Sequence, residues 1–151
     1  MSHTTTLKGI KISDPIALQE AVEFLRERGL NAELIENAVP RMYYANQYGK
    51  CDYVLRLANS PYDIGFAKQE DGSYAPVFDS WAGHLQKQIG NPSSCKVPTT
   101  AEEREAAAVA SLLNSYGVHA AKRQLEAEGY YGFQISVNNE DNSYVLEATQ
   151  Y

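Results

Sequence analysis

The sequence predicts a single α+β domain spanning residues 1–151, in which a mainly antiparallel sheet carries two or three helices packed mostly on one face. Apolar and polar residues alternate over 51–57 with the period of two that is typical of a strand with one buried face. Apolar residues spaced three and four apart follow Pro15 and, over a longer stretch, Thr100, so two segments are expected to be helical. A chain of 151 residues can bury about 70% of its unfolded surface in one core.

The chain is expected to open with a strand, a helix and a second strand. Residues 4–12 form the first strand, and Asp14 can then accept hydrogen bonds from the free N–H groups of a helix start. Pro15 fits the first turn because it has no N–H to satisfy. Gly29 is expected to adopt the left-handed conformation that ends a helix, and residues 30–36 predict the next strand.

The middle of the chain predicts the centre of the sheet. A strand over 51–57 is followed by a resumed alternation at residues 64–66. Asp71-Gly72 can adopt the positive φ angles that a tight hairpin turn needs, and residues 74–78 form the return strand. Pro76 in that strand is tolerated only near an edge or a bulge, because it has no N–H to donate.

The second half of the chain predicts helices and a final hairpin. A short helix over 81–89 is expected before a polar loop at 90–100. The longest helical pattern follows and ends at Gly129, and Gly117 within it predicts a kink or two consecutive helices. Residues 131–149 predict a terminal hairpin.

Composition and short motifs argue against several classes of function. The net charge of −6 disfavours binding to duplex nucleic acid, which relies on many lysines and arginines. No apolar run is long enough to cross a membrane and residues 1–8 lack the apolar core of a signal peptide, so a cytoplasmic protein is expected. Neither a metal nor a cofactor is expected, since CxxC, HExxH and phosphate-binding glycine motifs are absent. Cys51 and Cys95 are expected to be free thiols.

The unusual feature of the chain is an aromatic and basic constellation. Eleven tyrosines stand against four phenylalanines, and several lie near arginine or lysine. Aromatic rings can stack on a base while basic groups bind phosphate, and the same residue types also anchor protein interfaces. An ordinary rim of core and surface residues would have the same composition. The candidate ligand- or partner-binding residues are Arg41, Tyr43, Tyr44, Arg56, Tyr62, Lys68 and Trp81.

Several short stretches, spread over most of the chain, resemble one known family. They are Met1-Ser2-His3, Tyr62-Asp63-Ile64-Gly65-Phe66, Asp71-Gly72-x-Tyr74, Asp79-x-Trp81, and the helix and hairpin from Tyr116 to Thr149. The family is the Ycf-thirty-five-like group, a domain of unknown function found in cyanobacteria, plastids and bacteriophages. The sequence departs from its pattern at 90–100 and at 41–50, which look like additions. The resemblance implies a compact α+β domain in a phage or cyanobacterial setting, and it brings no catalytic residues to this chain.

These features favour a non-enzymatic binding or regulatory protein, phage-encoded as the resemblance implies, that acts by occlusion or sequestration through its Tyr/Arg-rich surface. The expected partner is a host protein or a small anionic, nucleotide-like ligand, and a homo-oligomer is compatible with either. One alternative is capture of a nucleotide-type signal molecule. A second alternative is a small hydrolase or nucleotide-modifying enzyme in which His84 works with Asp63 or Asp79 as an acid/base pair. Convergence of those side chains in one cleft would favour the enzyme.

Overall fold

The computed structural model describes residues 4–6, 11–42, 49–79, 109–138 and 143–150, and they confirm the predicted α+β fold. The helices and strands are β1 (Thr4–Thr6), α1 (Pro15–Glu27), β2 (Ala32–Ala38), β3 (Cys51–Leu57), β4 (Ile64–Lys68), β5 (Tyr74–Asp79), α4 (Ala110–Ala127), β6 (Tyr130–Val137) and β7 (Tyr144–Gln150). Every strand pair is antiparallel. The short helix expected at 81–89 and the polar loop expected at 90–100 lie outside the described residues.

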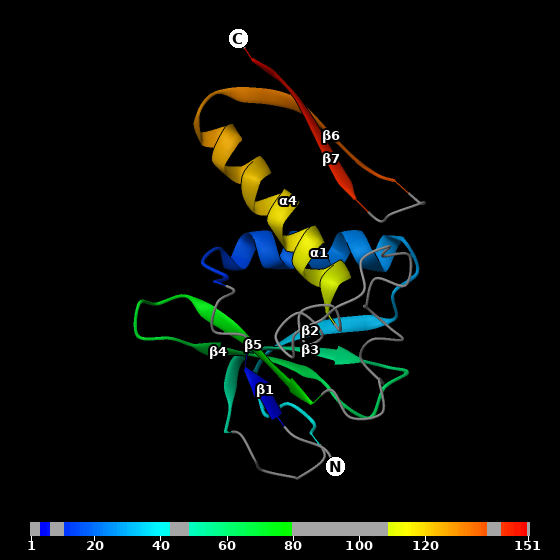
Figure 1. Ribbon diagram of the computed structural model, residues 1–151, viewed down its shortest axis with the longest axis vertical. Helices are drawn as coiled ribbons and strands as arrows, with labels where there is room; N and C mark the ends of the chain where they lie inside the picture. The colour runs from blue at the N-terminus through cyan, green and yellow to red at the C-terminus, as the bar shows by residue number, and fades with distance from the viewer. Residues whose placement is uncertain (1–3, 7–10, 43–48, 80–108, 139–142, 151) are drawn as a thin grey trace, which may run out of the picture.

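Five strands of the described residues form the main sheet in the order β1-β5-β4-β3-β2. The predicted strand–helix–strand opening is present as β1, α1 and β2. Its two strands lie at opposite edges of the sheet, so the chain that contains α1 passes from one edge to the other. The structure has three layers, with the sheet, then α1 and α4, then the β6–β7 hairpin (Figure 1).

The main core lies between the sheet and the two helices. Alternate strand residues such as Leu55, Ile64 and Phe78 are fully buried and pack with the buried face of α1. From α4, Leu112 and Tyr116 join the same cluster. Both helices therefore lie on one face of the main sheet, as expected.

The first helix begins and ends where the sequence predicts. The Asp14 carboxylate accepts from the N–H groups of Ile16 and Ala17 at 3.1 and 3.2 Å and also from Arg123 of α4. Burial alone would raise the pKa of Asp14, but the bonds from Arg123 and the helix N–H groups outweigh it and lower that pKa. Gly29 ends the helix with a φ of 106°.

The strand predicted over 30–36 begins two residues later than expected. The N–H of Leu30 donates to the carbonyl of Leu25 at 3.0 Å, which closes the last turn of α1. Because this N–H completes the helix end, Leu30 does not join the sheet and β2 begins at Ala32.

The prediction of a break at Gly117 is wrong, because α4 is one uninterrupted helix. Gly117 is exposed, and a side chain there would meet nothing within 4 Å, so the glycine costs about 1 kcal/mol of helix propensity and no packing. The residues around it hold the helix against α1. Ser115 Oγ donates to the carbonyl of Ala21 at 2.9 Å, and the buried His119 ring lies edge-on to Phe24.

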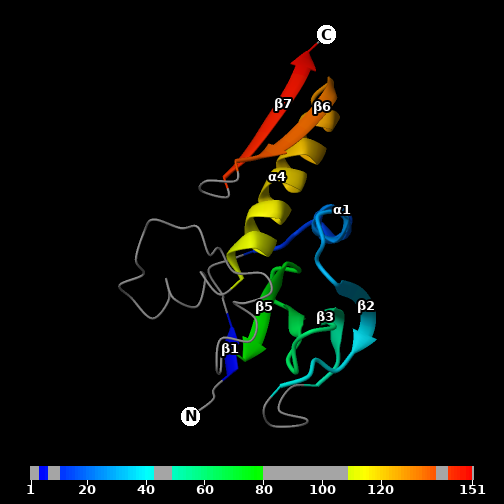
Figure 2. The same ribbon diagram turned by 90° about the vertical axis from the view of Figure 1, so that its right-hand side faces the viewer.

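The terminal hairpin is confirmed as β6–β7, but it forms a separate two-stranded sheet. It packs on α4, on the side away from the main sheet (Figure 2). Its inward residues, such as Phe133 and Leu146, are only partly buried, whereas Tyr131 and Val145 are exposed. The hairpin therefore adds a thin outer layer to the helices.

Candidate functional site

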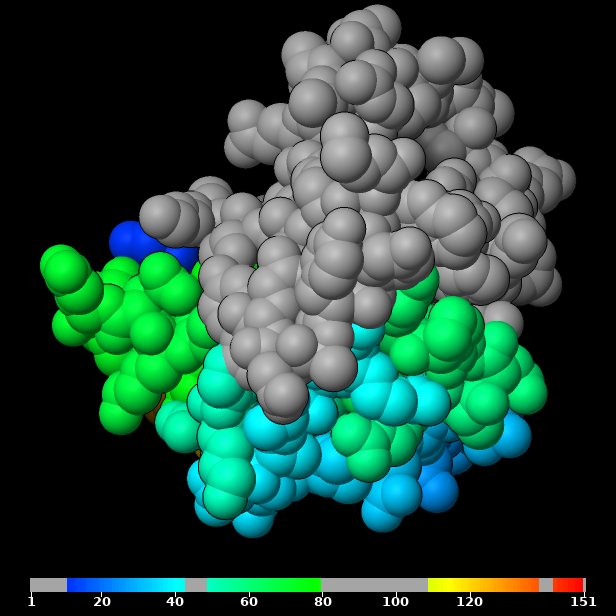
Figure 3. Space-filling view, turned by 90° about the horizontal axis from the view of Figure 1, so that it is seen from below, coloured from blue at the N-terminus to red at the C-terminus, as the bar shows by residue number. Residues whose placement is uncertain are grey.

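A cluster of three charged residues lies on the face of the main sheet that points away from the helices. The β3–β4 register pairs Leu55 with Ile64, so Arg56 lies opposite Asp63 one step further along. Because side chains alternate along a strand, Arg56 points away from the helix-facing Leu55. Arg41, three residues beyond the end of β2, reaches the same place. Figure 3 shows the molecule from this side of the sheet.

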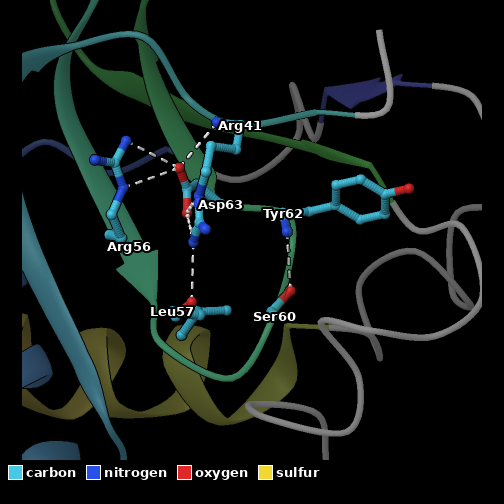
Figure 4. Close-up of polar contacts among 6 residues, drawn as sticks. All are labelled: Arg41, Arg56, Leu57, Ser60, Tyr62 and Asp63. Atoms are coloured by element: carbon cyan, nitrogen blue, oxygen red, sulfur yellow. Dashed lines mark hydrogen bonds and ion pairs between the residues drawn. The ribbon is translucent and has the colours of Figure 1, made fainter. Parts of the chain in front are cut away.

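Asp63 is fully buried and is held by five hydrogen bonds (Figure 4). Its Oδ1 accepts from Nε and Nη2 of Arg41 at 3.0 and 2.7 Å. Its Oδ2 accepts from the backbone N–H of Arg41 at 2.9 Å, and from Nε and Nη2 of Arg56 at 3.3 and 3.2 Å. Nη2 of Arg41 also donates to the carbonyl of Leu57 at 2.9 Å.

Arg41 and Arg56 together carry one positive charge more than Asp63, and the carboxylates of Asp79, opposite Asp63, and Glu33, opposite Arg56, lie next to this cluster. The side chains of Arg41 and Arg56 are 42% and 41% exposed, while Asp63 is 0% exposed. A guanidinium carries five N–H donors. In the described part of the chain, Nη1 of each arginine has no hydrogen-bond partner, so both can donate to a group that arrives from solvent.

The structure brings together only part of the predicted binding constellation. Arg41 and Arg56 converge on one carboxylate. The Tyr62 ring points away from both arginines and is buried in the core between sheet and helices (Figure 4). Lys68 is exposed at the other end of β4, five residues or about 17 Å from Asp63. The remaining candidates, which lie outside the described residues, are Tyr43, Tyr44 and Trp81.

The two acidic residues of the enzyme alternative are neighbours. The β4–β5 register pairs Gly65 with Val77, which places Asp63 opposite Asp79 two residues further on. Both side chains are buried, and both oxygens of Asp63 already accept from guanidinium groups. Asp63 would have to lose an arginine before it could accept a proton from a substrate. His84 lies outside the described residues.

Sequence reasoning missed a cleft between α1 and β2. It has a volume of about 500 Å³ and is lined by Gln19, Val22, Glu23, Arg26, Glu33, Leu34, Ile35, Glu36 and Tyr53. The sequence feature that could have indicated it is the set of glutamates at exposed positions of both α1 and β2. A second cleft of about 540 Å³ lies between α4 and the start of β7. The described residues that line that second cleft carry no charge.

Other candidate chemistry in the described residues is limited. No group of three His, Cys, Asp or Glu side chains there could hold a metal ion. Cys51 is a free, buried thiol, and burial together with the nearby Asp52 raises its pKa. None of the described helices is long and apolar enough to cross a membrane.

No family model matches this chain, and no curated protein or solved structure matches it either. The resemblance to the Ycf-thirty-five-like group therefore stays a prediction.

Proposed function

We propose that this chain is a non-enzymatic binding or regulatory protein that engages an anionic group through the pair Arg41 and Arg56. The observation that supports this proposal is the attachment of two half-exposed guanidinium groups to one buried carboxylate, Asp63. The carboxylate fixes the position of both groups before any ligand arrives. Binding then costs little side-chain entropy, and the outward N–H groups of the two guanidiniums can donate to an anion.

The two arginines contribute differently to this arrangement. Arg41 makes the short contacts with Asp63 and a further one to a backbone carbonyl, so one arginine is enough to neutralise the buried charge. Arg56 adds two contacts at the long end of the hydrogen-bond range. The second arginine is therefore the surplus cation, and it is the residue most available to an anionic ligand.

A guanidinium fork matches the planar pair of oxygens on a carboxylate or phosphate group. The partner is then an acidic surface of a host protein, bound by occlusion, or a small nucleotide-like ligand, bound by sequestration. A phage-encoded regulator of a host process fits either form. Capture of a nucleotide-type signal is the second candidate, because Tyr43 and Tyr44 follow Arg41 closely in the sequence and could stack on a base.

The test is calorimetric titration of the full chain with two probes, a nucleoside triphosphate and a short glutamate-rich peptide. Arg56→Gln should weaken binding of the preferred probe about tenfold or more, because it removes charge-assisted hydrogen bonds. Lys68→Gln is the matched control, since it removes an exposed cation at the far end of β4. Recovery of the nucleotide unchanged would separate capture from the hydrolase alternative that uses His84.

Glu33 provides a test with the opposite sign. It lies opposite Arg56 in the β2–β3 register, so its carboxylate competes with an incoming anion. Glu33→Gln should therefore tighten anion binding. Equal affinities for Arg56→Gln and Lys68→Gln, or no binding of either probe at millimolar concentration, would refute the proposal.

A further inference from the structure

The strand β2 is an edge of the main sheet, with β3 as its neighbour in the described part of the chain (Figure 2). The N–H of Ala58 donates to the carbonyl of Asn31 at 3.0 Å, and the register places these two residues directly opposite each other. Hydrogen-bonded and non-bonded pairs alternate along an antiparallel ladder. Every second residue of β2 therefore directs its N–H and C=O away from β3, toward the free edge. These residues are Ala32, Leu34 and Glu36.

The acidic cleft described above lies between this free edge and α1. Among the described residues, Glu23, Glu36 and Arg26 line it together with Glu33, whose side chain shares the opposite sheet face with Arg56. Arg26, the one cation of the described lining, already contacts Glu23 at 3.4 Å. Glu33 and Glu36 have no ion-pair partner among the described residues. The cleft thus combines the unpaired carboxylate of Glu36 with apolar residues that include Val22 and Tyr53.

We propose that β2 and this cleft bind an extended, cationic peptide segment of a partner protein, which adds to the sheet as a further strand beside β2. Unpaired backbone groups at a sheet edge supply the hydrogen bonds of such an addition, and pockets for alternate side chains supply the specificity. Lysine or arginine side chains on one side of the segment would lay their apolar stems over Val22 and Tyr53. Their charged ends would then reach Glu23 and Glu36.

The charges of β2 favour this occupant over a second copy of the chain. The strand carries Glu33 and Glu36 and has no lysine or arginine. Pairing two copies of β2 would bring four carboxylates together, which is unfavourable for residues on neighbouring strands. A cationic segment would instead relieve the repulsion between the glutamates. This site takes a ligand of the opposite charge and uses neither Arg41 nor Arg56, so it does not depend on the proposed function.

The experiment measures binding of three labelled, end-capped peptides to the full chain by fluorescence anisotropy. The first alternates threonine and lysine, the second alternates threonine and glutamate, and the third is the lysine peptide with every second amide N-methylated. We expect the lysine peptide to bind and the glutamate peptide not to bind. N-methylation should weaken binding about tenfold or more, because it removes the donors that pair with the strand edge. Added salt should weaken binding further.

Variants at Glu36 separate charge from backbone pairing. Glu36→Gln removes only the carboxylate and should weaken the lysine peptide about two- to fivefold, as for an exposed ion pair. Glu36→Pro also removes an N–H that β3 does not use, and should weaken binding about two- to tenfold more. Glu70→Gln, in the turn between β4 and β5, is the matched control and should change nothing. Thermal unfolding of each variant checks that the fold is retained.

Three outcomes would overturn the proposal. The glutamate peptide could bind as tightly as the lysine peptide, which would exclude charge recognition. The N-methylated peptide could bind as tightly as its parent, which would exclude strand addition. Sedimentation could show a dimer that Glu36→Pro dissociates, which would assign the edge to a second copy of the chain.

Discussion

Replacement of Arg41 by alanine should destabilise the fold much more than replacement of Arg56. Arg41→Ala removes both donors to Oδ1 of Asp63 and the donor to the carbonyl of Leu57, and it leaves Oδ1 buried without a partner. We expect a cost of about 2–3 kcal/mol, below that of a fully buried pair because Arg41 is partly exposed. Arg56→Ala removes two long hydrogen bonds to Oδ2 of Asp63, but Oδ2 still accepts a hydrogen bond from the backbone N–H of Arg41. This variant should therefore cost about 0.5–1 kcal/mol.

Urea unfolding at pH 7 measures both costs. With a denaturant slope of about 2 kcal/mol per molar, the midpoint should fall by about 1 M or more for Arg41→Ala and by less than about 0.5 M for Arg56→Ala. In an Asp63→Asn background, the costs of Arg41→Ala and Arg56→Ala in the free energy of unfolding should become more similar, because the buried charge that needs Arg41 is gone. If Arg56→Ala proved as costly as Arg41→Ala, Arg56 would be a structural residue and its surplus charge could not be assigned to a ligand.

Three further predictions concern single groups. The pKa of Asp14 is lowered in the folded state, so its contribution to the free energy of unfolding is complete above about pH 4 and is lost as the pH falls further. The Asp14→Asn variant should therefore lose less stability than the wild type below that pH. Acid titrations followed by circular dichroism would measure this difference. Gly65→Ala should cost about 1–3 kcal/mol in urea unfolding, because its Cβ would lie 2.9 Å from Sγ of Cys51, and Cys51→Ala should recover part of that cost. The hydrogen bond from Tyr74 to Asp52 raises the pKa of Tyr74 to about 12, so Asp52→Asn should return it toward 10.0 in an ultraviolet titration.

The sequence predicted best what residues close together in the chain decide. Asp14 begins α1, Gly29 ends it, and Gly72 takes a φ of 87° in the β4–β5 turn. Each of these outcomes depends on a cap or a turn a few residues long. The expectation for Pro76 needs a correction, because β5 lies between β1 and β4 and is not an edge strand. Pro76 is accommodated on the β4 side because the register turns its nitrogen away from β4, so its missing N–H removes no hydrogen bond from that ladder.

The features that the sequence did not predict depend on tertiary packing. Glycine lowers helix propensity at position 117, yet contacts of neighbouring residues with α1 keep α4 in one piece. The alternating pattern of the last two strands predicts a hairpin, but nothing local says whether it joins the main sheet. Its position on α4 follows from the partly exposed apolar side of that helix, including Leu113 and Val118.

The binding constellation was only partly predictable for a similar reason. Residue types suggested that basic and aromatic groups gather, but neighbours in an extended segment point to opposite sides, which sends Tyr62 into the core and Asp63 to the arginines. The enzyme alternative paired His84 with Asp63 or Asp79 as an acid/base pair. A carboxylate within the apolar stretch around Ile64 was the available signal for a buried ion pair, because such a charge must be compensated.

The two proposed surfaces meet at one cross-strand pair. Glu33 lines the acidic cleft and lies opposite Arg56, so the Cβ atoms of these residues are about 5 Å apart. An anion bound to Arg56 would cancel the positive charge nearest the cleft, and a cationic strand beside β2 would cancel the negative charge nearest the arginine pair. Each ligand should therefore favour the other by the same factor, with a coupling of about 1 kcal/mol or less between such exposed charges. Glu33→Gln should affect the two ligands in opposite ways. It should tighten binding of the anion, weaken binding of the cationic peptide and reduce the coupling free energy between the two ligands. A coupling of the opposite sign would mean that the two ligands compete for one surface.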